Sequence, residues 1–256
     1  HEIRERFYAP LKFGTAGLRG ILGAGINRMI VYTVRKATQG LANYILSQHG
    51  EKKGVAIAYD SRHFSPEFAD EAALCLAANG IKAYVFDSLR PTPELSFAIR
   101  ELGCISGINV TASHNKPQYN GYKVYWEDGG QMPPERADQI LALIHETDYL
   151  EALPMDEAEA REKGLLTIIG KEIDDAYIDC VKKLSISPEL IREMGDEIKI
   201  VYTPLHGSGN IPVRRIFDEI GMKHVYVVKE QELPDGEFPT VVVPNPEDPR
   251  AFKLAL

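Results

Sequence analysis

The sequence predicts an α/β protein with two consecutive domains, each built on a mixed, largely parallel β-sheet, and with the second domain incomplete. Two observations predict this class. Short apolar runs rich in β-branched residues alternate with longer segments that carry helix start and stop signals. This alternation occurs twice along the 256 residues, a length that is large enough for one or two domains.

The first alternation starts with a strand over residues 55–59, "VAIAY". A helix is expected over 65–80, with Ser65 as its N-cap, Pro66 in its first turn and Gly80 at its end. The elements expected after it are a strand over 82–87, a helix over 93–102, a strand over 104–111 and a helix over 134–146.

A polar, acidic stretch over 154–164 precedes the second alternation. The expected elements there are a strand over 197–202, a loop over 203–209, a helix over 211–221 and a strand over 224–228. The order of elements repeats that of the first unit, without residue-level similarity. We expect domain I to cover residues 1–168 and domain II to cover residues 169–256.

The two ends of the sequence suggest a longer protein. The chain opens with His1 rather than Met, so an upstream piece is expected. Three valines at 241–243 are followed by a turn and the opening of a helix, where the sequence stops. We therefore expect a fragment whose second domain continues beyond residue 256.

The composition excludes some classes of partner. The formal net charge of -8 argues against nucleic acid or an anionic membrane as the main partner. It allows an anionic small substrate, because a few local cations or a divalent metal reverse the sign inside a cleft. No apolar run reaches the roughly 18 residues that span a bilayer, and the N-terminal segment lacks the apolar core of a signal peptide.

The cysteines indicate a reducing compartment. Cys75, Cys104 and Cys180 form no Cys-x-x-Cys pair, and the first two lie in apolar runs. We expect small buried thiols rather than metal or redox sites. A cytoplasmic protein is the prediction.

A serine loop follows the strand expected over 104–111. Ser113 stands near His114, Lys116, Asn120 and Lys123. Alone, Ser113 would be an ordinary loop serine. With these neighbours it suits phosphoryl transfer, which needs an oxygen nucleophile and cations that neutralise the transferring group.

Acyl transfer is the other chemistry that a serine hydroxyl supports. It needs an adjacent base that is held by an orienting group. His114 and His206 are candidates for that base, but the sequence contains no Gly-x-Ser-x-Gly elbow. We therefore favour phosphoryl transfer.

A glycine-rich segment, "FGTAGLRG" over 13–20, precedes these elements. Glycines let a backbone approach a ligand closely, and Arg19 is able to direct two donors onto a phosphate. The segment is not a Rossmann fingerprint, because no strand precedes it and the spacing is absent. A plain glycine-rich turn with solvated arginines describes it equally well.

Three further groups have a structural interpretation. Asp60 and Arg62 are favoured as a structural pair at a helix entry. The loop over 203–209, "TPLHGSG", is open between a structural turn and a set of N–H groups facing a cleft. The paired acids at 174–175 and 247–248 are expected to start helices or turns rather than to bind metal.

Five segments together resemble blocks of the α-D-phosphohexomutase family, which contains the phosphoglucomutases and phosphomannomutases. They occur in the family's order, and the region they span, residues 13–209, is most of the chain. The segments are "FGTAGLRG", "YDSRHFS", "PTPELSFAIRELGCISGINVTASHN", "YNGYKVYWEDGGQ" and "TPLHGSG". The first and the fourth look most like the branch that contains bacterial phosphoglucomutases and phosphopentomutases.

The resemblance implies that Ser113 carries a phosphate. It would donate this phosphate to a bound sugar monophosphate, and the 1,6-bisphosphate would reorient and return its other phosphate. Thr15, Arg19 and Lys123 match residues that bind substrate. Arg19 and His114 would also take part in catalysis, with His114 holding the loop or contacting the phosphate. Lys123 is a candidate general base whose pKa would have to be depressed.

The expected reaction interconverts glucose 1-phosphate and glucose 6-phosphate, an intramolecular phosphotransfer that glucose 1,6-bisphosphate activates. Phosphopentomutase and phosphomannomutase are the alternatives within the enzyme class. A fragment that only binds sugar phosphate is the non-enzyme alternative. A sugar monophosphate is the expected partner, with no nucleic acid or membrane, and the protein is expected to be a monomer or dimer.

The resemblance also implies Mg²⁺, held by the phosphate on Ser113 and by three aspartates of an Asp-x-Asp-x-Asp loop. That spacing is absent from the sequence. In relatives the loop lies downstream of "VPNPE", so we expect little mutase activity from this chain alone. Lys116 stands where relatives have Pro, a change that leaves Ser113 and Lys123 in register.

Overall fold

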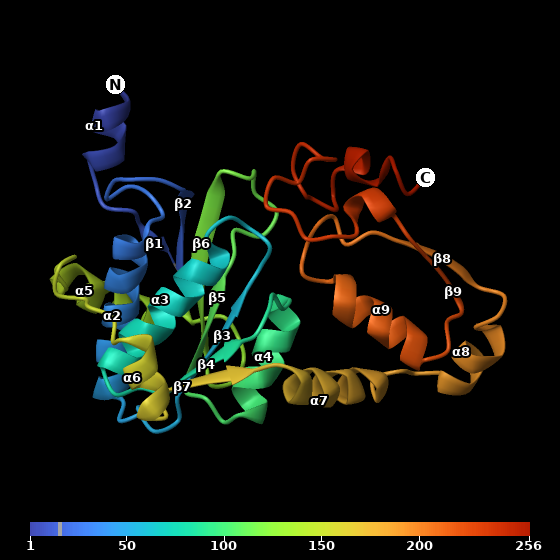
Figure 1. The fold of residues 1–256 in the computed structure, drawn as a ribbon, viewed down its shortest axis with the longest axis horizontal. Coiled ribbons are helices and arrows are strands. Elements are labelled where there is room, and N and C mark those ends of the chain that lie inside the picture. The colour runs from blue at the N-terminus through green and yellow to red at the C-terminus, as the bar shows by residue number, and fades with distance from the viewer. Residues whose placement is uncertain (15–16) are drawn as a thin grey trace. The chain divides into compact units, whose positions relative to one another are not determined.

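A computed structural model describes residues 1–14 and 17–256 of the chain (Figure 1). The described residues divide into two compact units. The first comprises His1–Ser113 and Gln118–Ile169, and the second comprises His114–Pro117 and Gly170–Leu256. The assignment of residues 1–168 and 169–256 to two family domains stays a prediction.

The first unit is built on a sheet whose described strands have the order β1-β2-β6-β5-β3-β4-β7. Strands β5, β3, β4 and β7 run parallel, whereas β6, β2 and β1 extend the sheet in antiparallel pairs. The bounds are β1 Phe13–Gly14, β2 Gly17–Ile21, β3 Val55–Tyr59, β4 Ala83–Phe86, β5 Ser106–Val110, β6 Tyr119–Trp126 and β7 Leu166–Ile169. The sheet is mixed, with a parallel part formed by the predicted strand–helix alternation.

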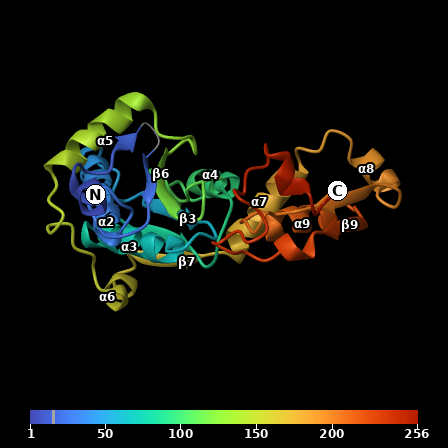
Figure 2. The same cartoon turned by 90° about the horizontal axis from the view of Figure 1, so that it is seen from above.

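Helices cover both faces of this sheet, and Figure 2 shows α2 and α4 on opposite sides of it. Helices α2 and α3 pack on one face, α5 packs against α2, and α4 contacts β3 and β5 on the other face. The bounds are α1 Glu2–Phe7, α2 Val31–Ser47, α3 Ser65–Ala78, α4 Thr92–Glu101, α5 Pro134–Glu146 and α6 Glu157–Glu162.

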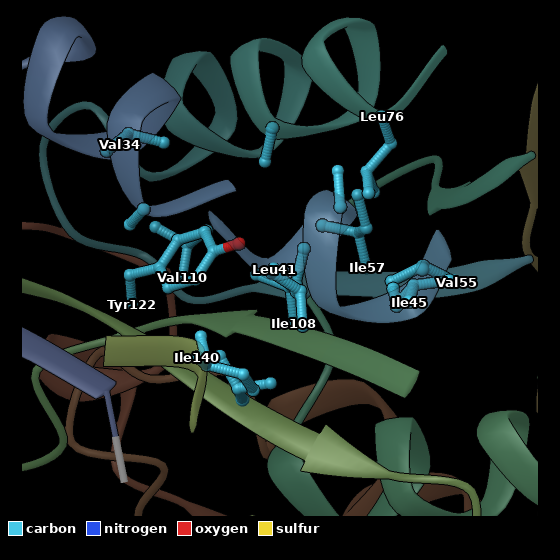
Figure 3. Close-up of a cluster of buried hydrophobic side chains, with 14 of the residues drawn as sticks. Val34, Leu41, Ile45, Val55, Ile57, Leu76, Ile108, Val110, Tyr122 and Ile140 are labelled. Atoms are coloured by element: carbon cyan, nitrogen blue, oxygen red, sulfur yellow. The ribbon is translucent and has the colours of Figure 1, made fainter. Parts of the chain in front are cut away.

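An apolar core fills the space between the sheet and the α2–α3 layer (Figure 3). Each fully buried Leu or Ile in it contributes about 1.5–3 kcal/mol to folding. Polar contacts also lie inside this core, among them a hydrogen bond of 3.0 Å between the hydroxyls of Thr38 and Tyr122. The labelled side chains are Val34, Leu41, Ile45, Val55, Ile57, Leu76, Ile108, Val110, Tyr122 and Ile140.

The start of α3 differs from the prediction. Phe64 is the N-cap, with φ of 63°, and Ser65 is already helical. The Ser65 Oγ donates to Asp60 Oδ1 at 2.8 Å instead of capping the helix. The prediction of Ser65 as N-cap is therefore wrong, because a carboxylate outside the helix takes its hydroxyl.

The glycine-rich segment is also more regular than predicted. Strands β1 and β2 lie within it and pair antiparallel, with Phe13 opposite Leu18. Strand β2 then pairs with β6, with Arg19 opposite Gly121. The described part of the segment is therefore strand and supplies the antiparallel edge of the sheet.

The second unit contains a two-stranded parallel sheet, β8-β9, among its described residues. Helices α7 and α9 pack against each other. The bounds are α7 Lys171–Lys182, α8 Pro188–Met194, β8 Lys199–Tyr202, α9 Asn210–Glu219 and β9 His224–Val227, followed by 3-10 helices η1 Lys229–Gln231 and η2 Pro249–Phe252. The predicted order of strand, loop, helix and strand is confirmed.

The helices of the structure were compared with the prediction that no segment spans a membrane. In the described part of the chain, no helix is long and apolar enough to cross a membrane.

Cys75 and Cys104 are buried, and burial raises the pKa of each thiol to about 12. Cys180 is exposed. The interpretation of the first two as small buried thiols is confirmed.

Candidate active site

Ser113 lies just beyond the carboxyl end of β5, at the edge of the sheet where ligands bind in parallel α/β folds. It is exposed, and its φ is 56°. This left-handed conformation costs a non-glycine residue about 1–2 kcal/mol. Strain of this kind persists only where the surrounding structure holds it in place.

The main chain at Ser113 is hydrogen-bonded on both sides. Its N–H donates to Thr111 Oγ1 at 2.9 Å, and its carbonyl oxygen accepts from Arg62 Nη2 at 2.8 Å. The same guanidinium donates from Nη1 to the carbonyl oxygen of Tyr119 at 3.1 Å. Arg62 therefore contacts both ends of the segment over 113–119, which is called the loop below and ends at Tyr119, the first residue of β6.

Asp60 anchors Arg62 from the end of β3. Its Oδ1 accepts from the Arg62 main-chain N–H at 2.9 Å, and its Oδ2 lies 3.4 Å from Arg62 Nε. The Arg62 side chain is fully inaccessible to solvent. Burial lowers the pKa of Arg62 and the charge of Asp60 opposes this, but a guanidinium stays protonated in proteins. The interpretation of the two residues as a structural pair is confirmed.

Asn120 is a structural residue rather than a donor around the Ser113 hydroxyl. It is fully buried, and its Nδ2 donates to His63 O and to Ser65 Oγ, each at 2.9 Å. Its Oδ1 accepts from Gly121 N–H at 2.7 Å. The amide thus joins the start of β6 to the start of α3. The sequence predicted that Asn120 would be one of the donors around the Ser113 hydroxyl. Its Nδ2 instead donates to His63 and Ser65.

Arg19 and Lys123 project from the same face of the sheet. Arg19 is opposite Gly121 and Gly17 is opposite Lys123 in the β2–β6 pairing. Opposed residues, and residues two apart on one strand, share a face. Burial lowers the pKa of Lys123, the positive charge of Arg19 lowers it further, and Asp60 opposes the shift. This direction is the one that a lysine general base requires.

Asn109 is a buried neighbour of Lys123 that the sequence analysis did not single out. It lies opposite Lys123 in the β5–β6 pairing and is buried. Its Nδ2 donates to Thr92 Oγ1, at the start of α4, at 2.7 Å. A polar residue in the middle of an apolar strand was the available signal, because a buried amide needs a partner.

Three residues that the sequence predicted near Ser113 are not located relative to Arg19 and Lys123. Thr15 lies outside the described residues. His114 and Lys116 are exposed and belong to the segment of the second unit. Their relation to Arg19 and Lys123 stays a prediction.

His206 has a structural role in the loop between β8 and α9. It is 3% exposed, its Nδ1 lies 3.1 Å from Leu233 O, and its Nε2 lies 2.9 Å from Thr240 Oγ1. Both ring nitrogens are thus occupied within the second unit. The acyl-transfer alternative with His206 as base is wrong, because neither nitrogen is available to a serine hydroxyl.

The described residues do not provide a metal site. They contain no group of three or more His, Cys, Asp or Glu side chains that could hold a metal ion. Asp175 pairs with Arg215 at 2.8 Å, and Asp248 caps η2 and pairs with Arg250. These acids are helix and turn acids, as predicted. The residues present therefore do not fit Mg²⁺ by themselves.

Comparison with known proteins gives a family. Residues 10–151 match the family described as "Phosphoglucomutase/phosphomannomutase, alpha/beta/alpha domain I", and residues 175–256 match its domain II. A phosphoglucomutase of Staphylococcus saprophyticus is 39% identical over 249 residues, which are 97% of this chain and 44% of the relative. A phosphopentomutase of Homo sapiens is 37% identical over 257 residues, covering 96% of this chain and 41% of the relative.

Solved structures agree on the fold. The crystal structure of a putative phosphomannomutase from Thermus thermophilus is similar with a TM-score of 0.80 and 26% identity, over 96% of this chain and 51% of that one. The chain spans less than half the length of the curated relatives it matches. The predicted α/β class is confirmed. With matches to two family domains across most of its length, the chain belongs to the phosphoglucomutase/phosphomannomutase family.

Proposed function

We propose that this chain carries the phosphoserine of a phosphoglucomutase that interconverts glucose 1-phosphate and glucose 6-phosphate. Ser113 is the proposed phosphoryl carrier, and a sugar 1,6-bisphosphate is the proposed intermediate. Thr15, Arg19 and Lys123 are proposed to bind substrate, and His114 is proposed to hold the loop or contact the phosphate. The proposed setting is the cytoplasm.

The chemistry is two reversible phosphoryl transfers. In the first, the bond between the Ser113 oxygen and phosphorus breaks while a sugar hydroxyl oxygen bonds to that phosphorus. The proton of the attacking hydroxyl goes to a base, and the Ser113 oxygen takes up a proton. In the second, the other phosphate of the bisphosphate returns to Ser113 by the reverse steps, so the phosphoserine is regenerated.

One observation carries this proposal: an exposed serine at a held, positive φ stands at the ligand-binding edge of the sheet. Arg19 and Lys123 supply positive charge from neighbouring strands, and charge stabilisation is the main requirement of phosphoryl transfer. Lys123, half-buried and with a lowered pKa, is the proposed base. The identity of 39% to a phosphoglucomutase supports the choice of reaction.

We propose that steady-state turnover by this chain alone is low. The described residues bring together no group that could hold a metal, so a phosphate on Ser113 would meet no protein set of Mg²⁺ ligands among them. When bound, Mg²⁺ would neutralise charge on the transferring phosphate. The residues of this chain perform the holding and proton-transfer roles described above.

Phosphopentomutase is the second candidate, and the 37% identity to the human phosphopentomutase favours it over phosphomannomutase. A chase separates the candidates. Chain that has taken up phosphate from glucose 1,6-bisphosphate is mixed with glucose 1-phosphate, ribose 1-phosphate or mannose 1-phosphate, and the bisphosphate formed is followed by ³¹P NMR. We expect the fastest transfer to be to glucose 1-phosphate. Fastest transfer to ribose 1-phosphate would favour the second candidate, and binding without transfer to any sugar would favour a binding fragment.

A further inference from the structure

Arg62 bridges the two ends of the loop over 113–119. Its Nη2 and Nη1 donate to the carbonyl oxygens of Ser113 and Tyr119, at 2.8 and 3.1 Å. These partners lie 51 and 57 residues away along the sequence. A guanidinium presents its donors in a rigid planar fork, so the two contacts together fix the separation between the loop ends.

The guanidinium is itself held from the protein interior. Asp60 Oδ2 faces its Nε at 3.4 Å, while Asp60 Oδ1 accepts from the Arg62 main chain and from Ser65 Oγ. Asn120 Nδ2 donates to the same Ser65 Oγ at 2.9 Å. Because the Arg62 side chain is fully inaccessible, water does not compete for these contacts, and removing one partner of such a network is costly.

The two contacts of Arg62 with the carbonyl oxygens of Ser113 and Tyr119, called the clamp below, affect the orientation of Ser113. Its N–H is bound to Thr111 Oγ1 and its carbonyl to Arg62, so both main-chain groups are directed into the protein while the residue is exposed. A trans peptide holds its C=O and N–H on opposite sides. The N–H of the peptide that follows Ser113 therefore points away from Arg62.

We propose that Arg62 is a positioning residue, which holds the loop over 113–119 by its two ends and so keeps the Ser113 hydroxyl outward at its strained φ. The catalytic purpose of these contacts rests on the proposed function, but the contacts themselves do not. Their geometry involves neither the sugar nor a metal. Loop order and phosphoryl transfer are therefore measured separately.

Three variants and a control test the clamp. Arg62→Met removes all donors, and Arg62→Lys keeps the charge but has one nitrogen that cannot span both carbonyls in the guanidinium geometry. Asp60→Asn with Arg62→Met removes the carboxylate that would be left unpaired. The control is Arg35→Met, which breaks a two-bond ion pair with Glu71 (2.6 and 2.9 Å) between α2 and α3.

The first readout is hydrogen–deuterium exchange of the full chain, comparing peptides that cover the loop with peptides from α4. We expect loop exchange to rise about tenfold or more, relative to α4, in all three Arg62 variants and to stay unchanged in Arg35→Met. Unchanged loop exchange in Arg62→Met would overturn the clamp. So would an equal rise in Arg35→Met, or wild-type exchange in Arg62→Lys, which would show that charge alone suffices.

The second readout is the rate at which Ser113 takes up phosphate from glucose 1,6-bisphosphate with Mg²⁺. We expect a fall of about tenfold or more in both single Arg62 variants and wild-type uptake in Arg35→Met. If wild-type chain takes up no phosphate, the proposed function fails while the exchange data still decide the clamp. If Arg62→Met does not fold, the clamp is tested with Arg62→Lys and with NMR of the wild-type chain. Slow exchange of the Arg62 Nη protons with solvent supports the clamp, and rapid exchange contradicts it.

Discussion

Ser113 combines a strained backbone with an exposed hydroxyl. Its φ of 56° is one that glycine adopts without steric cost and serine does not. The residue is nevertheless a serine, and the main-chain contacts from Thr111 and Arg62 hold it in place. Backbone strain of this kind, which lowers the stability of the fold, occurs most often at functional positions.

Replacement of Ser113 separates strain from chemistry. Both Ser113→Gly and Ser113→Ala remove the hydroxyl, but only glycine relieves the positive φ, so the glycine variant should be more stable than the alanine variant by about 1 kcal/mol. Urea unfolding measures the difference. The same pair at Ser47, the last residue of α2, is the control and should give the opposite order. Equal stability of the two Ser113 variants would show that the position is unstrained.

Lys123 provides a second prediction for a single residue. Its pKa is lowered by burial and by Arg19, so its amine should lose its proton at a lower pH than that of a free lysine, whose pKa is near 10.4. Amine labelling followed by peptide mass spectrometry across a pH series gives the midpoint for each lysine. We expect Lys123 to react with a lower midpoint than N-acetyl-lysine that is labelled in the same series. The same midpoint for both would remove Lys123 as the base.

The effect on stability has a definite sign. A lysine whose pKa is lower in the folded state binds fewer protons than in the unfolded chain at pH values between the two pKa values. The contribution of Lys123 to the free energy of unfolding therefore rises as pH increases through that window. Lys123→Met should flatten this rise.

At the level of elements, the site depends on close pairing of β2, β6 and β5. A Cβ added at Gly121 would lie 2.6 Å from Thr111 O and 2.8 Å from Leu18 O, both main-chain atoms that cannot move aside cheaply. Gly121→Ala should lower the free energy of unfolding by about 1–3 kcal/mol. Gly14→Ala, whose Cβ would meet nothing nearer than 3.9 Å, is the control. A neutral Gly121→Ala would show that the strands have room to separate.

Ion pairs connect α7 and α9 and give a prediction for acid stability. Hydrogen bonds from Lys182 and then Arg215 lower the pKa of Glu219 below its ordinary 4.5. A carboxyl with a lowered folded-state pKa stabilises the fold above its unfolded pKa, and this contribution is lost as pH falls through the folded value.

Urea unfolding of wild type and Glu219→Gln tests this at pH 7 and below about pH 4. The variant should be less stable than wild type at pH 7, and the two should converge in acid. Glu193→Gln, at an exposed position of α8, is the matched control. A difference that persists unchanged in acid would contradict the assignment.

At the level of the whole molecule, local sequence patterns predicted most of the alternating elements but not all of the fold. Helix α5 and strand β3 lie where the helix signals and the β-branched run predict them. Helix α2 was not predicted, because its N-cap is Ile30, and the capping hydroxyl comes instead from Thr33. Its buried Val34, Leu41 and Ile45 lie at helical spacing, which was the available signal.

The site was predicted only in part, and the reason is distance along the chain. Ser113, Arg19 and Lys123 stand in recognisable blocks, so their candidacy follows from local sequence. The clamp by Arg62 joins residues 51 and 57 positions apart, and the role of Asn120 depends on the start of α3. No local pattern specifies which side chain reaches which carbonyl, so these contacts emerge only from the three-dimensional structure.

The central claim is that Ser113 carries the transferred phosphate, and peptide-mapped mass spectrometry tests it most directly. The chain is analysed before and after incubation with glucose 1,6-bisphosphate and Mg²⁺, beside Ser113→Ala. We expect one added phosphate, localised to Ser113 in the wild-type chain and absent from the variant. Phosphate on another residue, equal uptake by Ser113→Ala, or an unmodified Ser113 after incubation would contradict it.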